Sequence, residues 1–139
     1  VYFFSQAVSA DEAREEAQFV IDQLNGRNLD LPIAYDHERV SADGARANTV
    51  DRATMTECAK AFCDTISAAG YSPIIYGNLH DLSRYHLSQL TEYPLWLAEY
   101  DTVVPTAPVR FAMWQYTSSG VVAGIDTAVD LNLRFTAAL

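Results

Sequence analysis

Positive charge, cysteine and long apolar runs are all scarce in this chain of 139 residues. Nine lysine and arginine residues stand against eighteen acidic ones, and the resulting net charge of −9 disfavours nucleic acid and anionic lipid as partners. No apolar run approaches the roughly 18 residues that a membrane-spanning helix needs, and no signal peptide is visible. We therefore expect neither nucleic acid nor a membrane among the partners.

The two cysteines, Cys58 and Cys63, lie in a segment whose apolar residues have helical spacing. Five residues apart on a helix, their Cα atoms would be roughly 8–9 Å apart on different faces, which is too far for a disulfide. Both are predicted to be free, mostly buried thiols, and they leave the redox compartment open.

Apolar residues make up 50% of the chain and aromatic residues 12%, which excludes disorder and predicts one globular domain over residues 1–139. The chain starts inside the apolar run Val1-Tyr-Phe-Phe4, with no methionine before it. We therefore expect it to be a piece of a longer protein.

Strand and helix signals alternate along the chain. A capping box that starts at Ser9 begins one predicted helix, which Gly26 ends, and a second helix carries an apolar stripe from Met55 and ends at Gly70. A shorter, irregular helical connection is expected over residues 79–90. Six strands are predicted over residues 1–7, 31–38, 73–77, 94–100, 109–116 and 129–135, with a Ser-Ser-Gly loop after the fifth.

This alternation predicts parallel strands joined by right-handed crossovers, either in a doubly wound sheet or in a barrel. A doubly wound nucleotide-binding fold would have a glycine-rich turn after the first strand, and residues 6–10 contain no glycine. The barrel fits better, although a closed one needs eight strands. The expected fold class is an incomplete (β/α) barrel with about six of its eight strands.

A barrel of this kind places its active site at the C-terminal ends of the strands, where the sequence has Asp36 and Glu38. Alternation along a strand puts both carboxylates on one face and turns His37 toward the barrel wall or the helices. Two carboxylates this close disfavour each other's ionisation, so one pKa should rise and keep a proton available for a glycosidic oxygen. A solvated surface pair is the alternative interpretation.

Other chemistries fit the sequence less well. A metal site made of Asp36, His37 and Glu38 would need a bulge to turn all three side chains together, so no metal is expected. No nucleophile elbow indicates a serine hydrolase, and Cys58 and Cys63 lie mid-helix, away from the strand ends.

Aromatic side chains gather at the same strand ends as the carboxylates. Together they suit carbohydrate, because sugar rings stack on aromatic planes while carboxylates accept hydrogen bonds from hydroxyls and supply acid and base. Trp96, Tyr100 and Trp114, taken singly, fit a role in the core equally well. The strand ends offer as candidate site residues Tyr2, Phe4, Asp36, Glu38, Tyr76, Trp96, Tyr100, Trp114, Gln115 and Asp130.

Six segments, in this order and spacing, resemble glycoside hydrolase family 25, the lysozymes (N-acetylmuramidases) with which many bacteria and phages cut peptidoglycan. The segments are Tyr2-Phe-Phe4, Leu31-Pro-Ile-Ala-Tyr-Asp-His-Glu38, Pro73-Ile-Ile-Tyr76, Leu95-Trp-Leu-Ala98 with Tyr100, Trp114-Gln-Tyr116 and Val129-Asp-Leu-Asn132. Each segment is common by itself, and the set runs over essentially the whole chain.

The resemblance implies a (β/α)5(β)3 barrel that hydrolyses the β-1,4 bond between N-acetylmuramic acid and N-acetylglucosamine, without metal or organic cofactor. Glu38 matches the family's general acid, Asp36 the residue that orients or polarises the substrate's 2-acetamido group, and Asp130 a further acid. The positions that match the family's groove are Tyr76, Trp96, Tyr100, Trp114 and Gln115. Because peptidoglycan lies outside the cytoplasmic membrane, an extracellular or cell-wall location is expected.

One departure from the family concerns its first two strands, whose opening Asp-Val-Ser-type motif supplies an active-site Asp. This chain begins at what would be the third strand, so the domain would be truncated at its N-terminus and its sheet would have open edges that can pair with another chain. We expect a dimer or a swapped assembly. Besides a muramidase, two interpretations stay open: a fragment that binds cell-wall glycan without cleaving it, and an ordinary α/β domain with an accidental acidic rim.

Overall fold

A computed structural model describes residues 1–41 and 45–135 as one curled sheet with helices packed on it. The strand order is the chain order, and the strands are β1 (Tyr2–Phe4), β2 (Ile33–Asp36), β3 (Pro73–Asn78), β4 (Leu95–Ala98), β5 (Met113–Gly120) and β6 (Val129–Arg134). Strands β1 to β5 pair in parallel, and β6 pairs antiparallel to β5. The predicted fold class, an incomplete barrel of six strands, is confirmed.

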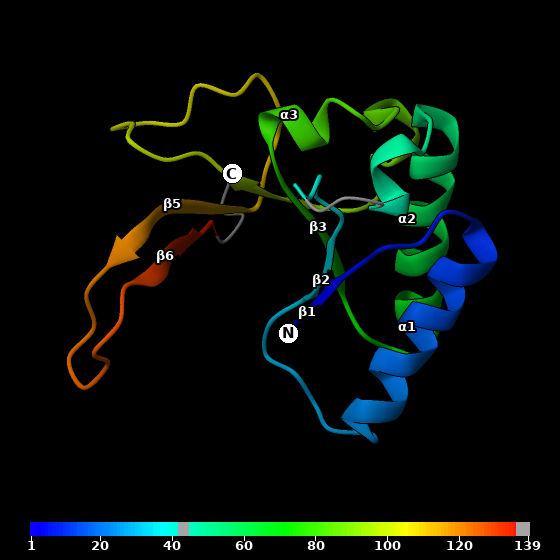
Figure 1. Cartoon of the computed structure of the whole chain (residues 1–139). Coiled ribbons are helices and arrows are strands. Elements are labelled where there is room, and N and C mark those ends of the chain that lie inside the picture. The colour runs from blue at the N-terminus through cyan, green and yellow to red at the C-terminus, as the bar shows by residue number, and fades with distance from the viewer. Residues whose placement is uncertain (42–44, 136–139) are drawn as a thin grey trace.

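Two long helices, α1 (Ala10–Leu24) and α2 (Arg52–Ala68), lie together on one side of the sheet (Figure 1). The Ser9 hydroxyl accepts a hydrogen bond from the Glu12 backbone N–H and begins α1, as predicted. The connection between β3 and β4 contains the short helix α3 (Leu79–Leu82) and a 3-10 turn, η2 (Leu87–Gln89). Another 3-10 turn, η1 (Arg46–Thr49), precedes α2. Among the described helices, none is both long enough and apolar enough to cross a membrane.

The larger core lies between these helices and the sheet. The rings of Tyr35 and Phe62, both fully buried, pack with their centroids 4.9 Å apart, and Phe3 joins them from β1. A smaller cluster of Ala34, Ile74 and Met113 lies on the other, concave face of the sheet. The sheet therefore has one face that packs against the helices and one concave face on which a site can form.

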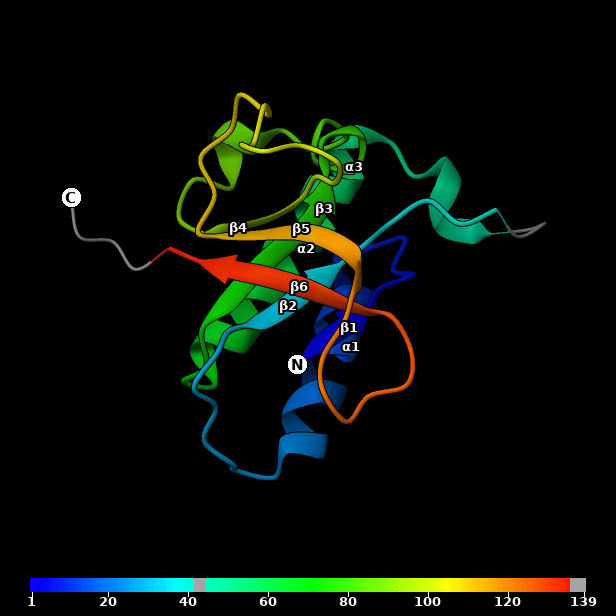
Figure 2. The same cartoon turned by 90° about the vertical axis from the view of Figure 1, so that its left-hand side faces the viewer.

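The curl of the sheet brings its last two strands round toward its first two. Figure 2 shows β5 and β6 in front of β1 and β2, and Figure 1 shows the hairpin of β5 and β6 extending away from the helices. In the described part of the chain β1 and β6 are the edge strands. The side chain of Tyr2, on β1, is 66% exposed as a consequence.

Some predicted strand boundaries are wrong. The fifth strand begins at Met113 and runs to Gly120, through the segment predicted as a Ser-Ser-Gly loop, because Thr117 and Gly120 pair with β6 across two irregularities of register. The first strand ends at Phe4, since Ser5 turns its hydroxyl to the Glu16 carboxylate 2.6 Å away on α1. Cys58 and Cys63 are buried free thiols on α2, as predicted.

Candidate active site

A pocket of about 220 Å³ opens on the concave face, at the C-terminal ends of the parallel strands. Its lining residues all come from the candidates that the sequence offered: Tyr2, Asp36, Glu38, Tyr76, Trp96, Gln115 and Asp130. The curl of the sheet is what brings Asp130, on β6, to the same pocket as Tyr2, on β1.

The register of the parallel strands explains the floor of the pocket. Asp36 pairs with Tyr76, and Tyr76 pairs with Trp96, so these three residues form one row across β2, β3 and β4. Strand β2 ends at Asp36, yet the chain continues so that Glu38 also lines the pocket. His37, between them, is fully buried on the other side, where its ring stacks on that of Tyr35.

Two of the three carboxyl groups that line the pocket, those of Asp36 and Glu38, have raised pKa values. Burial, followed by the charges of Glu38 and Asp81, raises the pKa of Asp36 to about 7. Burial also raises the pKa of Glu38, again with help from the charge of Asp81. The sequence predicted one raised pKa, caused by mutual repulsion; the structure raises both, and loss of water contact is the main cause.

Hydrogen bonds fix the polar and aromatic side chains that stand beside the carboxylates. The Tyr76 and Tyr100 hydroxyls both donate to Oε1 of Gln115, the former over 2.7 Å. The Trp96 indole N–H donates to Oδ1 of Asn132 over 2.9 Å, and the Trp96 and Tyr76 rings meet edge to face with their centroids 4.9 Å apart. These bonds hold the rings of Tyr76 and Trp96 in set orientations beside Asp36 and Glu38, which we call the acid pair. A sugar ring that binds here can contact both the aromatic rings and the carboxyl groups.

Three of the ten candidate site residues lie outside the pocket lining formed by the described residues. Trp114 neighbours Gln115 on β5, so alternation turns it to the opposite face, where it is buried and its indole N–H donates to the Glu99 carbonyl over 2.8 Å. Tyr100 reaches the pocket through its bond to Gln115. Phe4 is the register partner of Asp36 and is 40% exposed.

Sequence reasoning missed Asp81, whose charge raises the pKa of both Asp36 and Glu38. A signal for it exists: Asn78 and Asp81 are three residues apart at the end of β3, which is the spacing of a helix N-cap. The Asn78 side chain accepts from the Asp81 backbone N–H and donates to the Asp81 carboxylate, so the motif begins α3 and buries Asp81.

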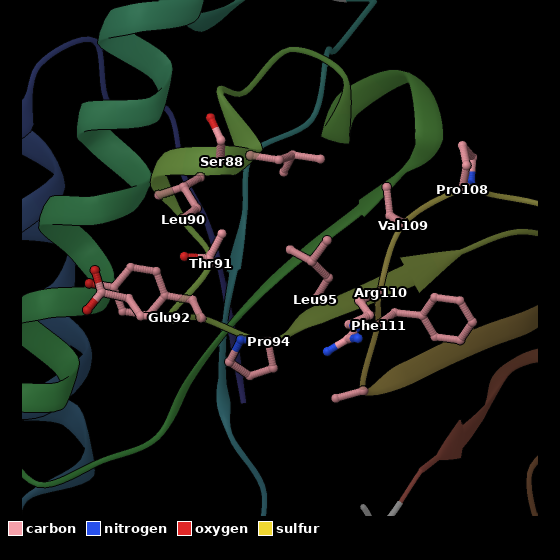
Figure 3. Close-up of a pocket in the computed structure, with 13 residues that line it drawn as sticks. Ser88, Leu90, Thr91, Glu92, Pro94, Leu95, Pro108, Val109, Arg110 and Phe111 are labelled. Carbon is pink, nitrogen blue, oxygen red and sulfur yellow. The ribbon is translucent and has the colours of Figure 1, made fainter. Parts of the chain in front are cut away.

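A larger cavity of about 760 Å³ lies elsewhere, between residues 87–95 and 108–112 (Figure 3). Its lining is mainly apolar, with Leu95 and Phe111 among the contributing side chains, and Glu92 is its one carboxylate among the described residues. Volume alone would favour this cavity, but acid and base chemistry requires the paired carboxylates of the smaller pocket.

Comparison with known proteins places the chain in a family. The autolytic lysozyme of Clostridium acetobutylicum is 25% identical over 129 residues, which are 93% of this chain and 38% of that protein. Among solved structures, the CTP1L endolysin superposes with a TM-score of 0.75 at 25% identity, over 96% of this chain and 45% of that one. The autolysin LytC of Streptococcus pneumoniae, in complex with a synthetic peptidoglycan ligand, superposes with a TM-score of 0.71 at 25% identity, over 95% of this chain and 32% of that one.

The chain thus spans less than half the length of each of these three proteins. The family model described as glycosyl hydrolases family 25 matches residues 1–125, which include every residue of the pocket lining except Asp130. The chain belongs to the glycosyl hydrolases of family 25.

Proposed function

We propose that the chain hydrolyses the β-1,4 bond between N-acetylmuramic acid and N-acetylglucosamine in bacterial peptidoglycan, as a single domain that acts outside the cell or in the cell wall. The observation that carries the proposal is the pair Asp36 and Glu38, whose pKa values burial raises in a pocket with an aromatic wall. The peptidoglycan ligand bound to the related LytC supports the choice of substrate.

In the proposed reaction Glu38 is the general acid. Its raised pKa favours the protonated form at the start of the cycle, and its proton passes to the glycosidic oxygen as the bond from that oxygen to the anomeric carbon breaks. Asp36 orients and polarises the 2-acetamido group of the substrate, whose carbonyl oxygen attacks the anomeric carbon. Water then opens the cyclic intermediate and returns the proton to Glu38. Asp130 faces the pair as a further acid.

The aromatic wall accounts for the proposed binding of glycan. Tyr76 and Trp96 present ring faces next to the row of Asp36, and Tyr2 lines the opposite side of the pocket at the open edge. Sugar rings bind such faces through their C–H bonds, while Gln115 and the carboxylates supply hydrogen bonds to hydroxyls.

A glycan-binding module without catalysis is the second candidate, and the open edge at β1 favours it. The side chain of Tyr2 is 66% exposed there, so one side of the pocket lacks a wall in the described residues. Pairing of the edge with a second copy, as a dimer or swapped assembly, would supply that wall. A concentration-independent monomer in sedimentation would refute the assembly.

A turbidity assay on purified peptidoglycan separates the two functions. The chain is compared with Glu38→Gln and with the control Glu15→Gln, which removes an exposed carboxylate on α1. Clearing by the chain and the control, and a loss of at least about 100-fold in Glu38→Gln with binding retained, is expected of the hydrolase. Binding without clearing by all three would support the binding module and refute the hydrolase.

A further inference from the structure

The buried polar atoms that lack a hydrogen-bond partner are concentrated in one place. Among the described residues, every such side-chain atom belongs to Asp36, His37, Asp81, Arg84 or Tyr85, which we call the polar cluster. Native proteins rarely leave polar atoms unpartnered in their interior, because each costs about 1–3 kcal/mol. Five residues with this property, one of them Asp36 of the acid pair itself, indicate a functional arrangement.

Local structure places Asp81 at the centre of the polar cluster. Asp81 lies in α3, directly after β3, and the Cβ of Asp81 is only 3.3 Å from where a Cβ on Gly77 would stand. The glycine therefore permits the helix to approach the strand closely. Asp81 is 3% exposed, and one of its carboxylate oxygens accepts from Asn78 while the other has no hydrogen-bond partner among the described residues.

Among the residues that the structure describes, Arg84 is the one cation that forms an ion pair with this buried carboxylate. The Arg84 guanidinium is 3.9 Å from the unpartnered oxygen of Asp81, too far for a hydrogen bond. Arg84 is also held by the Ala47 carbonyl, 3.4 Å away on η1. The guanidinium is thus kept at a distance that neutralises Asp81 incompletely, and the remaining negative field acts on the groups around it.

We infer that Asp81 is a positioning residue of the proposed active site, whose incompletely neutralised carboxylate keeps a proton on the Asp36 and Glu38 pair. The inference rests on the proposed function, which it deepens. Asp81 touches no substrate in this arrangement: its charge, held by Asn78 and Gly77 behind the pocket floor, makes ionisation of the whole pair more costly.

The groups that face the pair from each element agree with this assignment. Tyr2 on β1, Tyr76 on β3, Tyr100 after β4 and Asp130 on β6 face it from the pocket side, and none of them is a cation. From behind, Asp81 and Arg84 face it together with His37 and Tyr85, and burial lowers the pKa of His37 and so favours its neutral form. Arg84 is thus the one cation among these facing groups.

Carboxyl ¹³C NMR titration of the chain tests the inference without requiring activity. In Asp81→Asn, which keeps the shape and the acceptor for Asn78, the titration midpoints of Asp36 and Glu38 should fall by roughly 0.5–1 pH unit, the order of magnitude for removal of one nearby charge in a partly buried site. The exposed control Glu15→Gln should leave both midpoints in place. Asp81→Glu, which restores the charge, should return them toward their original values.

Arg84→Gln provides an independent test should Asp81→Asn not fold. Removal of the neighbouring cation leaves the field of Asp81 unopposed, so both midpoints should rise. A folded Asp81→Asn whose midpoints do not move, or an Arg84→Gln whose midpoints fall, would overturn the inference. Clearing of peptidoglycan is measured separately, so shifted midpoints in a chain that clears nothing would refute the proposed hydrolase and leave the role of Asp81 in place.

Discussion

Replacing Asp36 with asparagine should stabilise the folded chain at alkaline pH, although it removes a residue of the proposed active site. The pKa of Asp36 rises from 3.8 to about 7 on folding, so between these values the folded chain binds more protons than the unfolded chain. Stability must therefore fall as the pH rises through this window and stay low above it. Asparagine does not titrate in this range, so the variant does not lose this part of its folding stability as the pH rises.

The size of the effect follows from the shift. A difference of about 3 pH units corresponds to about 4 kcal/mol in total, of which about 2.5 kcal/mol falls between pH 5 and pH 8. Because the pocket is open to solvent on one side, screening reduces this to an expected 1–2.5 kcal/mol, roughly. Burial also raises the pKa of Glu38, which adds a slope of the same sign to both proteins.

Urea unfolding at pH 5 and pH 8 measures the effect directly. The free energy of unfolding of Asp36→Asn minus that of the parent should increase by about 1–2.5 kcal/mol between the two pH values. Glu15→Gln, at an exposed position on α1, serves as the control for the loss of one carboxylate and should follow the parent. Parallel losses of stability in Asp36→Asn and the parent would show that Asp36 ionises normally, and would refute the reasoning.

Three further outcomes test the fold. Phe62→Ala removes a fully buried ring from the larger core and should lower the free energy of unfolding by about 3–5 kcal/mol in urea. Gly120→Ala would place a Cβ 2.4 Å from the Leu131 side chain, so the hairpin should lose about 1–3 kcal/mol by the same measurement, whereas unchanged stability would contradict the close approach. Cys58, whose pKa burial raises to about 11, and Cys63, whose pKa rises further, should react with a thiol reagent at pH 8 only after unfolding.

The sequence predicts the order and type of the elements well because their signals are local. The capping box at Ser9 and the apolar stripe from Met55 each lie within one helix, and the structure has both helices. The end of β5 could not be predicted in this way. Residues 117–120 look like a loop, and only their pairing with β6, through irregularities that depend on the tertiary fold, makes them a strand.

The candidate site shows the same division between local and long-range information. Alternation places Asp36 and Glu38 on one side and His37 on the other, and the structure has this arrangement. Alternation also implies that Trp114 and Gln115 cannot both face the groove, and the structure turns Trp114 away. The N-cap spacing of Asn78 and Asp81 indicates a helix start in the sequence, but the influence of Asp81 on the pocket depends on the close approach of α3 to β3 at Gly77.

The proton-holding residue Asp36 and the aromatic residue Tyr2 of the pocket depend on different features of the fold. Asp36 is buried on β2, next to the edge strand β1, whereas Asp81 and Arg84 come from α3 and the residues that follow it, where α3 packs against β3. The pKa of Asp36 is already raised while β1 is an open edge, so this shift does not require the edge to be covered. Tyr2, by contrast, contributes its ring from that edge and is largely exposed. Covering the edge should consequently strengthen glycan binding far more than it changes the protonation of the acid pair.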